Sequence, residues 1–141
     1  MSRVFWDTNL FIYLFEGAGA HATRVKALRQ KMLERGDQLL TSTLTLGEVL
    51  VKPLEQGKEE LARKYHEAIT ATSVLIPLDV KAARIYAALR SDRSVCAPDA
   101  IQLACAAAAG VDLFITNDAR LQLKHVDGIQ FVVSLDRAPF F

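Results

Sequence analysis

Short apolar runs alternate with longer segments of helical periodicity along this chain. The runs are rich in β-branched and aromatic residues, and the alternation is typical of parallel strands joined by crossover helices. Five strands are expected, at residues 4–6, 38–42, 74–78, 113–116 and 129–133. The pattern therefore predicts an α/β fold in which helices flank a five-stranded parallel sheet.

Helices are predicted between these strands, each with a recognisable start or stop signal. Gly17 and Gly19 break the first, and Pro98 fits the first position of an alanine-rich helix that ends at Gly110. Pro77 cannot donate to a ladder, so it indicates that the third strand lies at a sheet edge. The helices are expected from Thr8, over 21–34, from about 46 to 53, over 58–71, 79–90 and 98–109, and briefly after Asp118.

One helical segment shows a clear division between an inner and an outer face. Val25, Leu28, Met32 and Leu33 form one stripe, and basic residues lie outside it. This segment is predicted to be an amphipathic helix on the surface of the domain.

The length and composition bound the domain organisation. A chain of 141 residues is the size of one domain, so residues 1–141 are expected to form one. The hydrophobic fraction of 51% leaves apolar surface that a partner could cover, whereas the net charge of +1 indicates no general attraction to nucleic acid. The longest uncharged tract, 100–111, is well short of the roughly 20 apolar residues of a membrane span, so a cytoplasmic protein without a membrane segment is expected.

The cysteines and histidines give no signal of metal or redox chemistry. Cys96 and Cys105 have no metal-ligand or redox spacing, and both are expected to be small buried hydrophobes. His21, His66 and His125 fall in or beside helices and loops, and they are expected at the surface.

Four acidic residues follow strands or open helices, where chemistry is expected in this fold class. Ligands of doubly wound sheets bind beyond the carboxyl ends of the strands, where the strand order reverses. Asp7 and Asp118 end the first and fourth strands, which would be neighbours if the fourth strand lies on the free side of the first. Glu48 follows the second strand, and Asp99 lies in the first turn of the helix that Pro98 begins. All four are predicted to gather at one edge.

Each acid also has a purely structural interpretation. Asp7 and Asp118 could cap helices, Glu48 could close a capping box with Thr45, and Asp99 could favour a helix dipole. Taken together, these interpretations leave four carboxylates close to one another. A single pair at 4 Å costs on the order of 4 kcal/mol at an effective dielectric near 20, so protons or cations must offset the repulsion.

Hard oxygen ligands of this kind select Mg²⁺ or Mn²⁺. A metal ion of this type can lower the pKa of an attacking water and stabilise charge on a scissile phosphate, which suits phosphodiester hydrolysis. Asn9 and Thr116 could orient the acids or waters, or could only make turn and cap hydrogen bonds.

At these residues the sequence resembles a PIN-domain ribonuclease, most closely the toxin of VapBC-type toxin–antitoxin pairs. The resemblance covers nearly the whole chain and rests on four short motifs in a fixed order. The motifs are the Asp-Thr-Asn at 7–9, the Thr/Ser-rich strand leading to Glu48, the Pro-Asp-Ala at 98–100 and the Thr-Asn-Asp at 116–118.

The resemblance implies a sheet in the order 3-2-1-4-5, a Mg²⁺ or Mn²⁺ site, cleavage of single-stranded RNA, a homodimer and inhibition by an antitoxin. It implies that Asp7, Glu48, Asp99 and Asp118 are catalytic metal ligands supported by Asn9 and Thr116. One departure is the loop 94–97, Ser-Val-Cys-Ala, where many relatives have a glycine-led entry. The departure concerns the shape of a substrate loop and leaves the acids unchanged.

The sequence leaves the RNA-binding residues and the biological role open. Basic residues near strand ends could contact RNA or be solvated; they are Arg3, Lys52, Arg90, Arg93, Arg120 and Lys124. The alternatives to a toxin are an RNA-processing nuclease, a non-catalytic PIN-fold module and a receiver-like signalling domain. The last would need paired acids near the first strand and a lysine after the last strand, and the sequence has neither.

Overall fold

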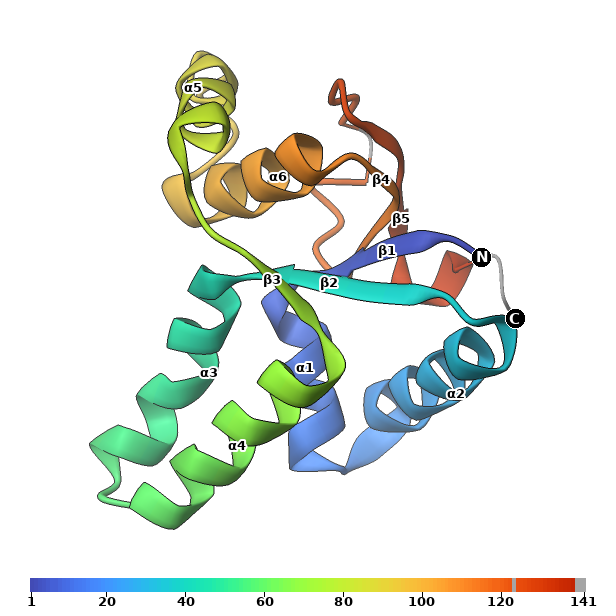
Figure 1. Ribbon diagram of the computed structural model, residues 1–141, viewed down its shortest axis with the longest axis vertical. Helices are drawn as coiled ribbons and strands as arrows, with labels where there is room; N and C mark the ends of the chain where they lie inside the picture. The colour runs from blue at the N-terminus through green and yellow to red at the C-terminus, as the bar shows by residue number, and fades with distance from the viewer. Residues whose placement is uncertain (123, 139–141) are drawn as a thin grey trace.

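The computed structural model describes residues 1–122 and 124–138, and it shows one five-stranded parallel sheet (Figure 1). The order is β3-β2-β1-β4-β5, which confirms the predicted class and strand order. The order reverses between β1 and β4, whose carboxyl ends therefore lie side by side. The strands are β1 (Arg3–Trp6), β2 (Gln38–Ser42), β3 (Val74–Ile76), β4 (Val111–Thr116) and β5 (Ile129–Ser134).

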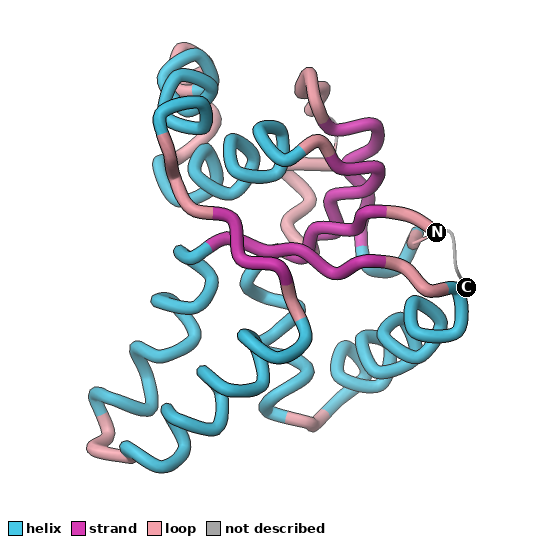
Figure 2. Tube along the Cα trace, viewed as in Figure 1, coloured by secondary structure: helices cyan, strands magenta, loops and turns pink. Residues whose placement is uncertain are grey.

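Helices cover both faces of the sheet, as Figures 1 and 2 show. α1 to α4 lie on one face, and α5 and α6 lie on the other. The helices are α1 (Thr8–Glu16), α2 (Gly19–Arg35), α3 (Thr43–Glu55), α4 (Glu59–Thr72), α5 (Val80–Leu89) and α6 (Ala97–Ala109), and a 3-10 turn spans Leu135–Arg137. In the described part of the chain, no helix combines the length and apolar character needed to cross a bilayer.

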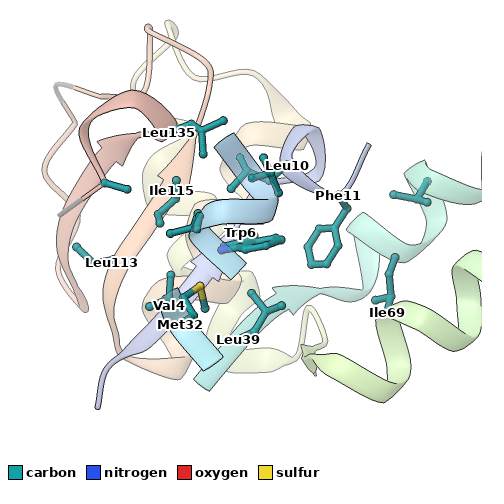
Figure 3. Packing of buried hydrophobic residues seen from close by; sticks show 14 residues of the cluster. Val4, Trp6, Leu10, Phe11, Met32, Leu39, Ile69, Leu113, Ile115 and Leu135 are labelled. Atoms are coloured by element: carbon teal, nitrogen blue, oxygen red, sulfur yellow. The ribbon is translucent and has the colours of Figure 1, made fainter. Parts of the chain in front are cut away.

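The core consists of two layers because a parallel sheet is buried on both faces. Val4 and Trp6 point to the side of α1 to α4, where the Trp6 and Phe11 rings lie 5.2 Å apart between centroids (Figure 3). Phe5 points to the opposite side and stacks on Phe114 of β4 at 5.2 Å. Strand alternation thus fixes both layers and holds the end of β1 in place.

Local sequence signals explain where the elements begin and end. The Asp7 side chain accepts a hydrogen bond from Thr8 N and caps α1, and Gly17 ends that helix with a φ of 70°. Asp79 caps α5 as predicted. Pro77 directly follows β3, which is an edge strand as predicted.

Two features predicted from the helical pattern are wrong. The sequence pattern places Leu33 in the inner stripe of α2, but its side chain is 57% exposed, since the buried residues of that helix follow spacings of three and four that end at Met32. Residues 119–122, expected to start a short helix, form successive turns in which Leu121 N donates to Asp118 O. The capacity of Asp118 to cap a helix is therefore not used.

The loop before β5 approaches α6 very closely. Gly128 has a φ of 97°, and a Cβ built there would lie 2.5 Å from the Ala107 carbonyl oxygen. The Gly128 carbonyl also accepts a hydrogen bond from Val111 N at the start of β4. Only glycine fits this contact, which joins the end of α6 to the sheet.

Candidate active site

Asp7 lies at the carboxyl end of β1 and is held by three donors. Thr8 N donates to its Oδ1 at 2.8 Å, and Thr116 Oγ1 donates to its Oδ2 at 2.7 Å. Gln102 Nε2 approaches Oδ1 at 3.4 Å. The residue is only 8% exposed, so the carboxyl group is fixed rather than solvated.

Glu48 is brought to the same place by Thr8. The Thr8 hydroxyl donates to Glu48 Oε1 at 2.7 Å, which ties α3 to the start of α1. The cap of α3 is Ser42, whose hydroxyl accepts from Thr45 N. The capping box that the sequence allowed between Thr45 and Glu48 is therefore not formed, and Glu48 is free of a helix-capping role.

A buried polar network supports these two acids from beneath. Gln102 Nε2 donates to the hydroxyls of Thr8 at 2.9 Å and Thr45 at 2.7 Å, and its Oε1 accepts from the Ser42 hydroxyl. Gln102 is 2% exposed, and the hydroxyl residues around it are also buried. Because every polar group of the amide has a partner, the network holds α6, β2 and the start of α1 in one arrangement.

Asp99 and Asp118 are joined by one arginine. Arg120 Nη2 lies 2.6 Å from Asp118 Oδ2 and 3.5 Å from Asp99 Oδ2, and its Nε donates to Asp118 Oδ1 at 3.0 Å. Cys96 Sγ donates to Asp99 Oδ2 at 3.0 Å. Asp118 Oδ1 also accepts a hydrogen bond from Arg120 N, so the turn after β4 folds around this acid.

Thr116 connects the two halves of the site. Its hydroxyl donates to Asp7 and accepts a hydrogen bond from Asp118 N at 3.0 Å. The next residue, Asn117, donates to the Tyr13 hydroxyl on α1 at 3.1 Å. Thr116 thus contacts both the side chain of Asp7 and the backbone of Asp118. The Oδ1 of Asn9 is buried and has no hydrogen-bond partner in the described residues.

The environment sets the charge of the acids in opposite directions. Burial raises the pKa of Asp7, and the nearby charges of Asp99 and Glu48 raise it further, against the hydrogen bonds from Thr116 and Thr8. The hydrogen bonds from Arg120 lower the pKa of Asp118. The fold therefore disfavours the ionised form of Asp7 and favours the ionised form of Asp118.

The four acids share one sheet edge, but they are not drawn together as a preformed cage. Within residues 1–122 and 124–138, no three Asp, Glu, His or Cys side chains are grouped closely enough to hold a metal ion. In the same residues, no Lys, Arg or His lies within 4.0 Å of the carboxylates of Asp7 and Glu48.

The other residues considered from the sequence lie in varied places. The three histidines are exposed, as predicted, and Cys105 is buried, so that the pKa of its thiol is raised to about 11. Cys96 is exposed, which corrects the prediction of a buried residue: it directly precedes α6 and contacts Asp99. Arg3 binds the Gly110 carbonyl at the opposite sheet edge, away from the acids.

Sequence reasoning missed Gln102, Thr8 and the position of Arg120. Gln102 has a visible signal, because it is an uncharged polar residue inside an otherwise apolar and alanine-rich helix. Thr8 lies inside the Asp-Thr-Asn motif, but nothing in the sequence shows that its hydroxyl reaches Glu48. Arg120 was one of six basic candidates with no feature that separated it from the others.

Comparisons with known proteins agree with this architecture. No curated protein sequence matches the chain. Several solved structures match, among them three that cover most of both chains. "Crystal structure of VapBC2 from Rickettsia felis bound to a DNA fragment from their promoter" has a TM-score of 0.71 at 14% identity, and covers 94% of this chain and 98% of its own.

The other two structures have similar scores. "Toxin-antitoxin complex from Klebsiella pneumoniae" has a TM-score of 0.64 at 25% identity, and covers 89% of this chain and 94% of its own. VapBC-5 from Mycobacterium tuberculosis, a member of the VapBC family of toxin–antitoxin systems, has a TM-score of 0.65 at 20% identity, and covers 95% and 99%.

A family model links the fold to the sequence. The model described as "PIN domain" matches residues 4–129, a stretch that contains all four acids, the strands β2 to β4 and all of β1 except its first residue. Since this match spans most of the chain and the strand order agrees with it, the chain belongs to the PIN domain family.

Proposed function

We propose that this chain is a metal-dependent endoribonuclease that hydrolyses phosphodiester bonds in single-stranded RNA and acts as a toxin neutralised by an antitoxin. PIN domains are nucleases, and they generally use divalent metals. The observation that carries the proposal is the convergence of Asp7, Glu48, Asp99 and Asp118 at the carboxyl edge of the sheet, where β1 and β4 meet.

The donor chemistry of the four acids fits a hard divalent cation, but their side chains would have to move closer together to hold it. Their donor atoms are carboxylate oxygens, which Mg²⁺ and Mn²⁺ prefer. Burial and, to a lesser extent, the nearby charges of Asp99 and Glu48 raise the pKa of Asp7, and a cation would offset the repulsion between these charges. Asp7, Glu48, Asp99 and Asp118 would hold the ion, with Thr116 orienting Asp7 and Asn9 in a supporting position.

The chain's own residues would hold the acids in position for the reaction. The ion, when bound, supplies an activated water and stabilises the negative charge that develops on the phosphate. Thr8 and Thr116 fix one oxygen of Glu48 and one of Asp7 by hydrogen bonds of 2.7 Å, so these acids lose little freedom on binding a cation. Gln102 keeps Thr8 in the position that this requires.

The toxin role is supported by a groove beside the acids. Ile12, Phe15, Val49, Leu61 and Tyr65 from α1, α3 and α4 line an apolar groove that also reaches Glu48. A polypeptide bound there would lie next to a proposed metal ligand and block access to it. The similar solved structure from Klebsiella pneumoniae is a toxin–antitoxin complex, and the one from Mycobacterium tuberculosis belongs to a family of toxin–antitoxin systems, so an antitoxin is the partner that we propose for this groove.

A homodimer is also proposed. Several apolar side chains are exposed, and contact with a second copy would cover them; they are Val51, Leu54, Val74, Leu78 and Val80, at 42–80% exposure. Light scattering on the purified chain would give the mass directly. A mass of twice 15.6 kDa is expected.

The nuclease proposal is tested with a panel of single-stranded RNAs. We expect cleavage by the wild-type chain with Mg²⁺ or Mn²⁺, and none with EDTA or with Asp7→Asn. The Asn side chain keeps the size and the capping ability of the Asp but loses the charge that binds the ion. Cleavage that persists in EDTA would refute the metal dependence, and the absence of cleavage under all conditions would refute the activity.

The toxin role is separated from RNA processing by a second test. We expect the product of a small gene immediately upstream to bind the chain and to stop cleavage. A processing enzyme would instead cleave at the same rate with and without that protein.

A further inference from the structure

Arg120 forms ion pairs with two of the four acids of the candidate site, Asp118 and Asp99. Its guanidinium binds Asp118 at two points, through Nε at 3.0 Å and Nη2 at 2.6 Å, and it lies 3.5 Å from Asp99. These two acids come from α6 and from the turn after β4. A planar guanidinium matches carboxylate geometry, so the single positive charge bridges two elements.

Nothing else in the described chain anchors this guanidinium. The hydrogen bonds and ion pairs of its nitrogens all go to Asp118 and Asp99, and the side chain is 68% exposed. Movement of Arg120 into solvent would leave the hydrophobic core and the network around Gln102 intact. The side chain is therefore held by the acids alone.

The same carboxylate oxygens cannot bind both Arg120 and a divalent ion strongly at the same time. Asp118 Oδ2 and Asp99 Oδ2 both face Nη2 of Arg120, and these oxygens belong to two of the proposed metal ligands. A divalent ion carries twice the charge of the guanidinium and would repel it at this distance. Binding of the ion therefore disfavours the ion pairs of Arg120 with Asp99 and Asp118.

We propose that Arg120 is a built-in counterion that competes with the divalent metal for Asp99 and Asp118, and that metal binding releases its guanidinium to bind the RNA phosphate backbone. This rests on the proposed function, because it takes the four acids as the metal site. A phosphate group offers the freed arginine the same two-point pairing that the carboxylate of Asp118 gave it.

The metal arm of the test measures Mn²⁺ binding by calorimetry in the absence of RNA. We expect Arg120→Gln to bind Mn²⁺ about three- to tenfold more tightly than the wild type, the range expected from loss of a partly exposed, two-point Arg–carboxylate pair. Arg120→Lys keeps a competing charge and should stay close to the wild type. If Arg120 only held the turn in place, its removal would weaken metal binding, which is the opposite sign.

The RNA arm measures binding of a single-stranded oligonucleotide by fluorescence anisotropy, with Ca²⁺ replacing Mg²⁺ to prevent cleavage. We expect Arg120→Gln to lose about three- to tenfold in RNA affinity, since one phosphate contact is removed. The matched control is Arg63→Gln, which removes a similar exposed pair with Glu60 on α4 and should change neither measurement.

The outcomes separate this inference from the nuclease proposal. Unchanged or weaker Mn²⁺ binding by Arg120→Gln overturns the competition, and unchanged RNA affinity overturns the transfer to phosphate. Either result leaves the nuclease proposal in place if the wild type still binds Mn²⁺ and cleaves RNA. Failure of Mn²⁺ to bind to both the wild type and Arg120→Gln would instead overturn the metal site itself.

Discussion

At the scale of single residues, Asp7 shows a conflict between stability and the proposed chemistry. Its carboxyl is 8% exposed and close to the charges of Asp99 and Glu48, so the ionised form is disfavoured in the metal-free fold. The same arrangement makes a divalent cation favourable. The residue is therefore expected to destabilise the chain until an ion binds.

The prediction that follows concerns Asp7→Asn without metal. Because the folded-state pKa of Asp7 is raised, the wild type loses stability as the pH rises from the ordinary pKa of Asp through the raised one. In EDTA at pH 7, Asp7→Asn should be more stable than the wild type, and the difference should decrease as the pH is lowered toward 3. Urea unfolding at the two pH values measures it.

Asp92→Asn is the control for this prediction. Hydrogen bonds from Ser94 and Lys124 lower the pKa of Asp92, so its ionised form is favoured by the fold and its replacement should give no stabilisation at pH 7. An Asp7→Asn chain less stable than the wild type at pH 7 would contradict a raised pKa for Asp7.

The sequence predicts the four acids of the site better than it predicts their partners. Asp7 and Asp118 follow strands whose carboxyl ends must be neighbours once the order reverses, so their proximity follows from topology. Gln102 and Arg120 act through rotamers and distances, such as the 2.6 Å between Arg120 and Asp118, that no residue spacing specifies. Side-chain direction after a turn is decided by tertiary packing.

At the scale of elements, capping residues and glycines made most boundaries predictable. Asp79 and Gly17 mark ends that the structure confirms to within one residue. The exception is the turn after Asp118, where Arg120 N and its side chain both bind the acid and favour a turn over a helix. A local ion pair of this kind competes with helix formation and gives no periodic signal.

The contact of Gly128 with α6 gives a prediction at the same scale. Gly128→Ala should lower the unfolding free energy by at least about 2 kcal/mol, because the new Cβ would meet the Ala107 carbonyl in addition to the unfavourable φ. Gly57→Ala, with a φ of 68° and open space around it, isolates the backbone effect and should cost about 1 kcal/mol. If Gly128→Ala and Gly57→Ala lost the same stability in urea unfolding, the loop at Gly128 would accommodate the new Cβ without an additional loss of stability.

At the scale of the whole molecule, the proposed metal site depends on the complete sheet. Asp7, Glu48, Asp99 and Asp118 are far apart in sequence and meet only through β1, α3, α6 and the turn after β4. An ion held by all four has no comparable site in the unfolded chain. Metal binding should therefore stabilise the native state by mass action.

Mn²⁺ is accordingly expected to raise the midpoint of thermal unfolding. At an ion concentration about a hundredfold above the dissociation constant, the stabilisation is about 2.7 kcal/mol, or roughly 5–10 °C for a domain of this size. Asp7→Asn should show little of this shift, and Arg63→Gln should show all of it. A shift of equal size in Asp7→Asn would place the ion elsewhere on the protein.

The position of Thr116, between Asp7 and the Asp118 backbone, has a consequence for synthesis of the chain. A nascent chain in which β4 and the following turn have not yet been translated lacks Thr116, Asp118 and Arg120. If the nuclease proposal holds, the growing chain cannot cut RNA before β4 and the turn after it have been translated. The cell would then have until that point of translation to supply whatever restrains the enzyme.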